Sequence, residues 1–329
     1  MKSWHKTKSL ARTGYFATHY AASLALLRWY GGQRSEGHLS LPSWRRYLAS
    51  IEAMIDADSY DLEHAHYIDP HPGTLPNFES IKSYYGDFKA FIERQKKQDI
   101  VVQSPNTALP QYYQRAFHFQ PNGWLSDQSA VQYEFSVEVL FLGLARVMRR
   151  RGLGLLRQHF HPQRRVENRI LDIGSGDGSF TDLLEVNFPT ASVFGLDLSE
   201  YYLRKARKDG HQKQILGLAE QLPIASEHVD VVTSIFVMHE LPSRIRQQVF
   251  QDAYRTLKKG GHFLITDSLQ YSDDPAMDGL LERFPQLFHE PFFEKYCQSP
   301  LETLAQDEGF TLYDKEVHFL SKSLLFVKN

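Results

Sequence analysis

A glycine-rich turn in the second half of the chain constrains the fold more than any other segment. The run DIGSGDG at residues 172–178 follows an apolar stretch at 169–173 that predicts a β-strand, and it precedes a helical pattern at 180–188. Glycine allows the backbone to turn sharply and lets a ligand approach without meeting a Cβ atom. The start of the following helix adds a partial positive charge. The segment therefore predicts a strand–turn–helix unit that binds a small ligand.

Predicted strands and helices continue to alternate towards the C-terminus. Further strands are predicted at 192–198, 214–218, 229–236, 262–268, 310–317 and 321–327, and further helices at 201–208 and 243–259. Gly260 and Gly261 are expected to end the second of these helices. This alternation predicts an α/β fold in residues 166–329, a Rossmann-like seven-stranded sheet with helices on both faces.

The first half of the chain differs in composition and in predicted secondary structure. Residues 1–165 are rich in aromatic residues and helical spacings, which predicts a mostly helical N-terminal domain. A helix is expected at 44–55, with one apolar face formed by Tyr47, Leu48, Ile51 and Ile55. A later helix should begin after an N-cap at Ser126 and run to the basic residues 149–151, which suit a helix C-terminus. Residues 152–167 are then expected to form a solvated linker.

Composition and charge narrow the class of partner. The formal net charge is −2 and the pI is about 6.7, which gives no general attraction to nucleic acid or to an anionic membrane. The apolar run at 20–27 is too short to span a bilayer and reads as an amphipathic helix. A single cysteine, Cys297, excludes an internal disulfide. We therefore expect a cytoplasmic protein with no nucleic-acid or membrane partner; the oligomeric state is not predicted.

Three features of the glycine-rich segment favour S-adenosylmethionine as the ligand. The glycines are spaced G-x-G-x-G, and Ser179 stands where a dinucleotide fingerprint requires its third glycine. Asp172, two residues before the first glycine, suits a ligand that carries an ammonium group. Asp197 ends the second predicted strand, where a carboxylate can accept both ribose hydroxyls. Dinucleotide sites share this last feature, so it indicates a nucleoside without deciding which one.

Residues 168–269 resemble the class I S-adenosylmethionine-dependent methyltransferases of the type 11 group. The matching segments are ILDIGSGDG at 170–178, GLDLS at 195–199, AEQLP at 219–223, DVVTS at 230–234 and LKKGG at 257–261. Segments 117–126, 267–270, 278–285 and 288–291 also resemble a bacterial subgroup that has an N-terminal helical extension and relatives in plants. The resemblance implies the seven-stranded methyltransferase fold and S-adenosyl-L-methionine as cofactor.

The resemblance also implies the roles of particular residues. The loop from Gly174 to Gly178 wraps the methionine moiety, Asp197 holds the ribose, and Ala219 and Glu220 lie beside the adenine. The cofactor-binding set expected here is Asp172, Gly174, Ser175, Gly176, Gly178, Asp197, Leu198, Ala219, Glu220 and Ser234. Many relatives have Asp or Asn where this chain has Leu218, so a backbone group or Glu220 is expected to contact the adenine.

The acceptor should lie beyond the carboxyl ends of the strands. Three polar groups are expected to converge there, namely the pair at 239–240, Asp267 and the pair at 289–290. His239 is the best candidate for a general base, because imidazole titrates near neutral pH; the alternative is a loop or capping histidine. Asp267 and His289 are further catalytic candidates, with an Asx-turn as the alternative for Asp267. The expected substrate-side residues are His118, Trp124, Tyr133, Glu240 and Glu290. The insertion at 268–298 suits a lid, or simple packing on the sheet edge.

The leading hypothesis is methyl transfer to a small-molecule acceptor through oxygen, nitrogen or carbon. The alternatives are another reaction that consumes S-adenosylmethionine, a non-catalytic cofactor-binding subunit, and a nicotinamide oxidoreductase. The histidines show no Cys₂His₂ or H-E-x-x-H spacing, so no metal site is expected.

Overall fold

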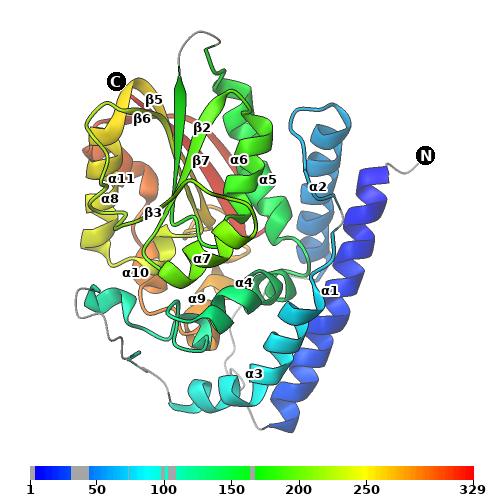
Figure 1. Cartoon of the computed structure of the whole chain (residues 1–329). Helices are drawn as coiled ribbons and strands as arrows, with labels where there is room; N and C mark the ends of the chain where they lie inside the picture. The colour runs from blue at the N-terminus through cyan, green and yellow to red at the C-terminus, as the bar shows by residue number, and fades with distance from the viewer. Residues whose placement is uncertain (1–3, 31–43, 73, 98–100, 103–108, 164–166) are drawn as a thin grey trace.

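The computed structural model describes residues 4–30, 44–72, 74–97, 101–102, 109–163 and 167–329. Its centre is a seven-stranded sheet in the order β3-β2-β1-β4-β5-β7-β6, which confirms the predicted seven-stranded fold (Figure 1). The strands are β1 (Asn168–Ile173), β2 (Ala191–Asp197), β3 (Gln214–Leu216), β4 (Val229–Ile235), β5 (Leu257–Ser268), β6 (Phe310–His318) and β7 (Ser321–Lys328). Strands β1 to β5 pair in parallel, whereas β7 pairs antiparallel with both β5 and β6.

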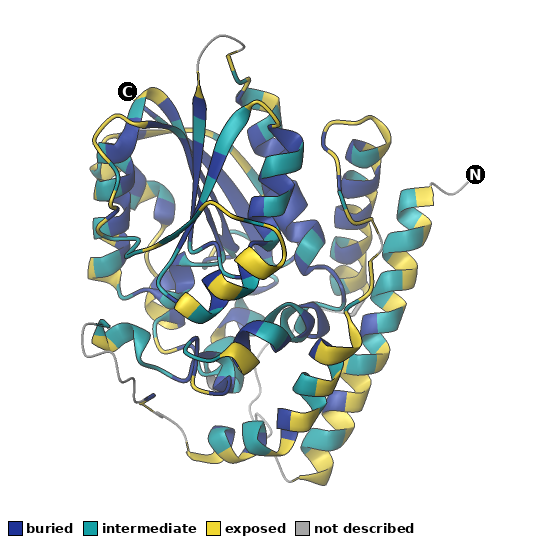
Figure 2. Cartoon of the chain, viewed as in Figure 1, coloured by how far each residue is buried: buried dark blue, intermediate teal, exposed yellow. Residues whose placement is uncertain are grey.

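Helices cover both faces of the sheet because its central strands are apolar on both sides. One face packs against α5 (Ala145–His159) and α6 (Ser179–Asn187), in a core that includes Leu156, Ile170 and Leu184. The other face packs against α8 (Ser243–Thr256) and α11 (Leu301–Asp307), where Phe250 and Phe263 are buried. α7 (Glu200–Lys208) lies beside β2 and β3. Figure 2 shows the strands and α5 as mostly buried and α7 as exposed along one side.

The N-terminal region is helical, as predicted. It contains α1 (Trp4–Trp29), α2 (Trp44–Glu63), α3 (Phe78–Lys97) and α4 (Asp127–Leu140). α1 and α2 lie side by side, on the opposite side of the molecule from α8 and α11 (Figure 1). In α2, Ile51 and Ile55 are buried as expected, but Leu48 is 58% exposed, so its predicted place on the apolar face is wrong. None of the described helices is long and apolar enough to cross a membrane.

The long helix predicted after Ser126 is interrupted. Ser126 is the N-cap, its side chain accepting a hydrogen bond from the Ser129 N–H. However, α4 ends at Leu140, because Leu142 (φ 54°) and Gly143 (φ 81°) adopt left-handed conformations that a helix cannot contain. α5 then runs to His159. The prediction of a solvated linker is therefore wrong for residues 152–159, which are helical. The predicted domain boundary at 165 lies outside the described residues.

The three arginines at 149–151 are buried in the middle of α5, so their predicted place at a helix C-terminus is wrong. Arg149 Nη1 donates to both oxygens of Glu134 at 2.8 Å. Arg150 binds Asp58 at 2.7 and 2.8 Å and Asp69 at 2.7 Å, while Arg151 binds Asp61 and Glu316. Each buried charge therefore has an opposite charge beside it, which offsets its loss of hydration. These ion pairs connect α2 and α4 to α5, and the pair of Arg151 with Glu316 connects α5 to β6.

The segment after α8 also departs from expectation. α8 ends at Thr256, and residues 257–268 form one continuous strand, so Gly260 and Gly261 lie within β5 instead of ending a helix. Gly260 has a φ of 74°, and the pairing of β4 with β5 shifts register between Val229 and Val231. The glycines thus mark an irregularity in the sheet.

After β5 the chain forms two short helices, α9 (Asp278–Phe288) and α10 (Phe293–Cys297), within the insertion predicted at 268–298. Three 3₁₀ turns complete the described elements: η1 (Gln111–Tyr113), η2 (Phe117–Phe119) and η3 (Met238–Glu240). α10 lies against η3, and α9 lies against η2. These neighbours bring the insertion and the N-terminal half to the same end of the sheet.

Candidate active site

A cavity lies beyond the C-terminal ends of β1, β2 and β4, where the strand order reverses. Ligands in open α/β sheets bind at this position. The sheet side of the cavity is lined by Asp172, Gly174, Ser175, Gly176, Leu196, Asp197, Leu198, Ala219, Ile235, Phe236 and Val237. The N-terminal half provides the opposite wall, with Tyr112, Tyr113, Phe117, Trp124, Tyr133 and Arg149. The two halves of the chain therefore enclose one site.

The glycine-rich turn forms the floor of this cavity through backbone conformations that favour glycine. Gly174, Gly176 and Gly178 have φ angles of 67°, 56° and 88°. A Cβ on Gly174 would lie 2.4 Å from Val237 Cγ2, so the turn also has to pass close to the segment after β4. The Gly176 N–H donates to Asp197 Oδ2 at 2.9 Å, and this bond joins the turn to the end of β2.

Two carboxylates lie at this floor, of which Asp172 is buried and Asp197 is partly exposed. Asp197 accepts hydrogen bonds from the N–H groups of Gly176 and Ser199, and its carboxylate borders the cavity. Asp172 is 1% exposed, and burial raises its pKa to about 7, although hydrogen bonds from Thr233 and Thr181 oppose the shift. Asp172 therefore holds β1, β4 and α6 together as well as bordering the cavity.

The structure brings together most of the predicted cofactor-binding residues. Those that line the cavity are Asp172, Gly174, Ser175, Gly176, Asp197, Leu198 and Ala219. Gly178, Glu220 and Ser234 are not among the lining residues. Gly178 is the N-cap of α6, Ser234 is buried within β4, and Glu220 accepts a hydrogen bond from Tyr112 at 2.6 Å. Glu220 thus contacts the wall residue Tyr112 from outside the cavity. It lies next to Ala219, which lines the cavity.

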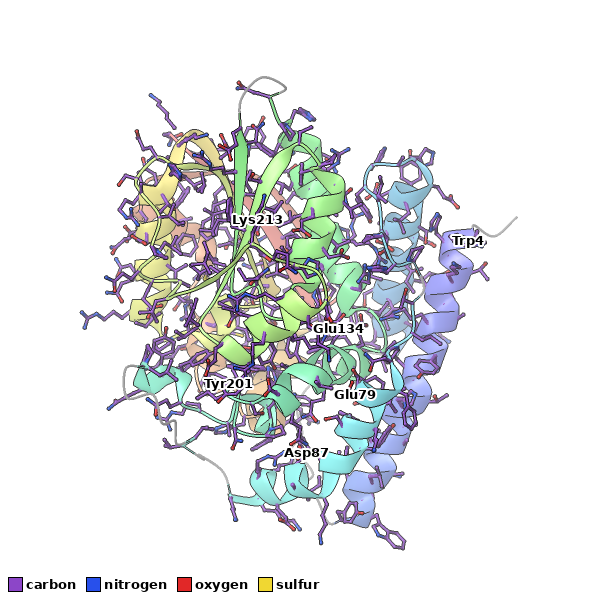
Figure 3. All side chains as sticks on the ribbon, in the orientation of Figure 1. Trp4, Glu79, Asp87, Glu134, Tyr201 and Lys213 are labelled. Carbon is purple, nitrogen blue, oxygen red and sulfur yellow. The ribbon has the colours of Figure 1, made fainter. Side chains whose placement is uncertain are left out.

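Sequence reasoning missed several wall residues. Tyr112 and Tyr113 lie in a 3₁₀ turn, and Arg149 was expected at a helix C-terminus. No local pattern marks these side chains, because the packing of α4, α5 and η1 against the end of the sheet places them. Of the described lining residues, Arg149 is the only lysine or arginine. In the view of Figure 3 its partner Glu134 lies near the middle of the molecule, whereas Trp4 lies at the end of α1.

A second group of polar side chains adjoins the cavity. His239 Nδ1 lies 2.6 Å from Asp267 Oδ1, and its Nε2 lies 4.0 Å from one oxygen of Glu240 and 4.0 Å from one of Glu290. His118 Nε2 lies 2.9 Å from Glu290 Oε1 and 3.7 Å from Glu240 Oε1. Three of these groups were predicted as substrate-side residues and one as the base, so residues 118, 239, 240 and 290 do converge.

The charge state of the two histidines bears on the predicted base. Burial lowers the pKa of His239, but Asp267, Glu290 and Glu240 raise it to about 9. Burial likewise lowers the pKa of His118, and Glu290 and Glu240 raise it to about 10. Both rings are then positively charged imidazolium groups at neutral pH. His239 can therefore act as a base only after it has lost one of its two ring protons.

Of the other two catalytic candidates, Asp267 lies against His239, whereas His289 lies outside the polar group. Asp267 is fully buried behind His239 and also accepts the N–H groups of Met238 and Ser268, so it orients the imidazole and does not line the cavity. The ring of His289 stacks on Phe119 at 5.2 Å, outside the group formed by residues 118, 239, 240 and 290. Residue 290, not residue 289, is the member of this pair that joins the site.

An apolar pocket continues from this polar group. It shares Tyr133, Phe236 and Glu240 with the first cavity and contacts His118 and His239. The rest of its lining is mainly apolar and includes Val137, Leu140, Phe141, Leu280, Phe284 and Phe293. Phe284 and Phe293 belong to the insertion at 268–298. The polar group of residues 118, 239, 240 and 290 thus lies between the first cavity and this apolar compartment.

Comparison with known proteins gives the family. Residues 171–265 match a family model described as a methyltransferase domain. The chain is 37% identical over 120 residues to an arsenite methyltransferase of Halobacterium salinarum, which covers 33% of this chain and 30% of that protein. It is 39% identical over 99 residues to a malonyl-[acyl-carrier protein] O-methyltransferase of Methylococcus capsulatus, covering 28% and 34%.

The matched segments thus span about a third of these two relatives' own lengths. A solved phosphoethanolamine N-methyltransferase 2 of Haemonchus contortus in complex with S-adenosyl-L-methionine is similar with a TM-score of 0.40 and 18% identity, covering 54% of this chain and 52% of that one. The chain carries, in residues 171–265, a class I methyltransferase domain whose cofactor is S-adenosylmethionine.

Proposed function

We propose that the chain transfers a methyl group from S-adenosylmethionine to a small-molecule acceptor that binds between the two halves of the chain. The observation that carries this proposal is the cavity itself. Its floor is the glycine-rich turn joined to Asp197, and its far wall comes from the N-terminal half. The matched relatives named for small acceptors, arsenite among them, support the same class. We also propose that the protein is cytoplasmic and has no nucleic-acid partner.

The lining groups fit the chemistry of the cofactor at both of its ends. Asp197 would hold the ribose hydroxyls, since its carboxylate borders the cavity and retains lone pairs beyond its two backbone bonds. Asp172 and Asp177 would face the ammonium group and Arg149 the carboxylate of the methionine moiety. Tyr112, beside Ala219, would cover the adenine. When bound, S-adenosylmethionine supplies an electrophilic methyl group on a sulfonium sulfur.

The residues of the chain would then act mainly by positioning the acceptor. Trp124 and Tyr133 would form an aromatic wall beside the sulfonium, where a cation is attracted to ring faces. The N-terminal helices and the insertion at 268–298 would close the acceptor side and exclude water, with Phe284 and Phe293 lining the apolar compartment. The acceptor would reach the cofactor past Glu240, which lines both cavities.

The test is calorimetric titration of the purified chain with S-adenosylmethionine, S-adenosylhomocysteine and NADH. We expect the first two to bind and NADH not to bind. Asp197→Asn should weaken binding about 10- to 100-fold, because each hydrogen bond to a charged group contributes about 1.5–3 kcal/mol. Asp209→Asn, at an exposed carboxylate that pairs with Lys205 at the end of α7, is the matched control and should bind normally. Tighter binding of NADH, or no binding to the folded chain, would refute the proposal.

Product analysis separates methyl transfer from its alternatives. With acceptor mixtures present, S-adenosylhomocysteine should accumulate with one methylated product. Methylthioadenosine would instead indicate transfer of the aminocarboxypropyl group. Binding without turnover by any acceptor class would favour a non-catalytic cofactor-binding subunit.

A further inference from the structure

Four side chains with metal-ligating atoms meet beside the cavity although they come from three separate segments. His118 lies in η2, His239 and Glu240 in η3, and Glu290 between α9 and α10. One donor atom from each of the four lies within 4.8 Å of every other. No spacing in the sequence marks this group, which explains why a metal site was not expected.

The separations of the donor atoms suit a single small cation. The nitrogen–oxygen distances within the group run from 2.9 Å to 4.0 Å. Bonds of about 2.0–2.1 Å to a tetrahedral ion place neighbouring ligand atoms roughly 3.3 Å apart. The widest separation among the four atoms, up to 4.8 Å, would have to shorten by as much as about 1.5 Å when one ion binds, which small rotations of the side chains can provide.

Glu290 provides an independent sign that something is bound here. Its side chain is 0% exposed, and neither of its oxygens accepts a hydrogen bond from a described residue. Oε1 approaches His118 Nε2 without the alignment of a hydrogen bond. A buried carboxylate normally has donors or a metal ion to offset its lost hydration. In Glu290, Oε1 instead faces Nε2 of His118 at 2.9 Å and Nε2 of His239 at 4.0 Å, and Oε2 has no hydrogen-bond donor among the described residues.

The surrounding residues are arranged as outer partners of a metal site. Asp267 binds Nδ1 of His239, so the Nε2 of that ring faces Glu240 and Glu290. Trp124 Nε1 donates to Glu240 Oε2 at 3.1 Å, which leaves Oε1 turned towards both histidines. Carboxylates behind ligating histidines and donors behind ligating carboxylates are typical of metal sites, because they fix the orientation of the ligands.

We infer that His118, His239, Glu240 and Glu290 bind one divalent transition-metal ion beside the cofactor cavity. Two imidazoles with two carboxylates favour Zn²⁺, Fe²⁺ or Mn²⁺ over Mg²⁺, which prefers an all-oxygen shell. Two neutral histidines and two carboxylates also balance the charge of a divalent ion, so the ion and its four ligands together would carry no net charge.

This inference deepens the proposed function, on which its role in the reaction rests. Glu240 lines both the cofactor cavity and the apolar compartment, so an ion held there would lie between cofactor and acceptor. With four protein ligands in place, the acceptor's hydroxyl would have to bind as a fifth ligand; the ion would then lower the pKa of that hydroxyl, whose proton leaves to solvent. The favoured acceptor is therefore an apolar or aromatic compound that presents a hydroxyl oxygen to the ion.

The competing explanation is a network of two imidazolium–carboxylate pairs without metal. To distinguish the two, the chelator-treated full chain is titrated with Zn²⁺, with Co²⁺ as a spectroscopic probe and with Mg²⁺ for comparison. We expect one equivalent of Zn²⁺ or Co²⁺ to bind, the visible Co²⁺ absorption to indicate mixed nitrogen and oxygen ligands, and the thermal midpoint to rise. Glu290→Gln and His239→Gln should weaken binding at least tenfold.

His159→Gln is the matched control, since His159 pairs with Asp314 away from the site, and it should bind the ions like the original chain. The metal inference is overturned if the folded chain binds S-adenosylhomocysteine but neither Zn²⁺ nor Co²⁺, or if Glu290→Gln binds them equally well. Metal binding without binding of S-adenosylhomocysteine would instead leave this site standing and refute the proposed function. The two failures are therefore distinguishable.

Discussion

Asp267 Oδ1 lies 2.6 Å from His239 Nδ1, and the carboxylate of Asp267 is fully buried. Because the other oxygen accepts the Met238 N–H, the carboxylate is held by the backbone of the same turn that carries the histidine. The imidazole therefore has one orientation, with Nε2 directed at Glu240 and Glu290. The end of β5 thus controls a group on η3 that adjoins the cofactor cavity.

Replacing Asp267 should disturb the polar group without affecting the cofactor. Asp267→Asn keeps the size of the side chain but removes the charge that orients His239. We expect metal affinity and methyl transfer to fall about 10- to 100-fold, as for other outer partners of metal ligands. Binding of S-adenosylhomocysteine should not change, because Asp267 does not line the cofactor cavity. Calorimetry measures both ligands; equal losses for both would show that the substitution disrupts the fold instead.

Arg150 should contribute strongly to stability. Its guanidinium binds Asp58 and Asp69, and all three side chains are buried. Arg150→Met would leave two buried carboxylates without their partner, which should lower the free energy of unfolding by about 3–5 kcal/mol. Arg204→Met is the control, because its pair with Asp127 is exposed and should matter by less than about 1 kcal/mol. Urea denaturation of both variants tests this, and similar losses would contradict it.

Asp172 should make stability depend on pH with a defined sign. Its folded-state pKa is raised to about 7, so the folded chain holds a proton that the unfolded chain releases at about pH 4. The contribution of Asp172 to the free energy of unfolding is therefore fully present below pH 4. It is lost as the pH rises to about 7, by at most about 1.4 kcal/mol per pH unit.

The amide of Asp172→Asn does not titrate and serves as the reference for this prediction. Unfolding free energies of both proteins are measured in urea from pH 4 to pH 8 without cofactor. The difference, original minus variant, should decline up to about pH 7 and then level off. A difference that is constant across this range, or that grows with pH, would contradict the raised pKa.

Two glycine-to-alanine substitutions should have opposite effects. Gly174 has a φ of 67°, and a Cβ there would meet Val237 at 2.4 Å, so Gly174→Ala should destabilise by about 1–3 kcal/mol and weaken cofactor binding. Gly86 lies inside α3 with no atom within 4 Å of an added Cβ, so Gly86→Ala should stabilise by about 0.5–1 kcal/mol. Urea denaturation with titration of S-adenosylhomocysteine checks both; a neutral Gly174→Ala would contradict the close approach.

The cofactor half of the site could be predicted because its parts are local in sequence. The glycine turn, the start of α6 and Asp197 follow directly from strand ends, and parallel strands bring such ends to one edge. Regular alternation of strands and helices likewise predicted the seven-stranded sheet. Helix ends were harder: the break at Leu142 and Gly143 depends on two left-handed residues that the apolar periodicity of the segment does not reveal.

The acceptor half depended on contacts between distant segments. The sequence alone indicated that His118, His239, Glu240 and Glu290 belong near the site, but their mutual distances arise only when η2, η3 and the insertion pack together. The same packing buried Arg149 in the wall of the cavity and turned His289 aside onto Phe119. Local patterning thus determined the sheet and the cofactor turn, because backbone conformation and strand periodicity act over a few residues. The tertiary structure decided which charged groups face one another, since burial and pairing of charges depend on segments more than a hundred residues apart.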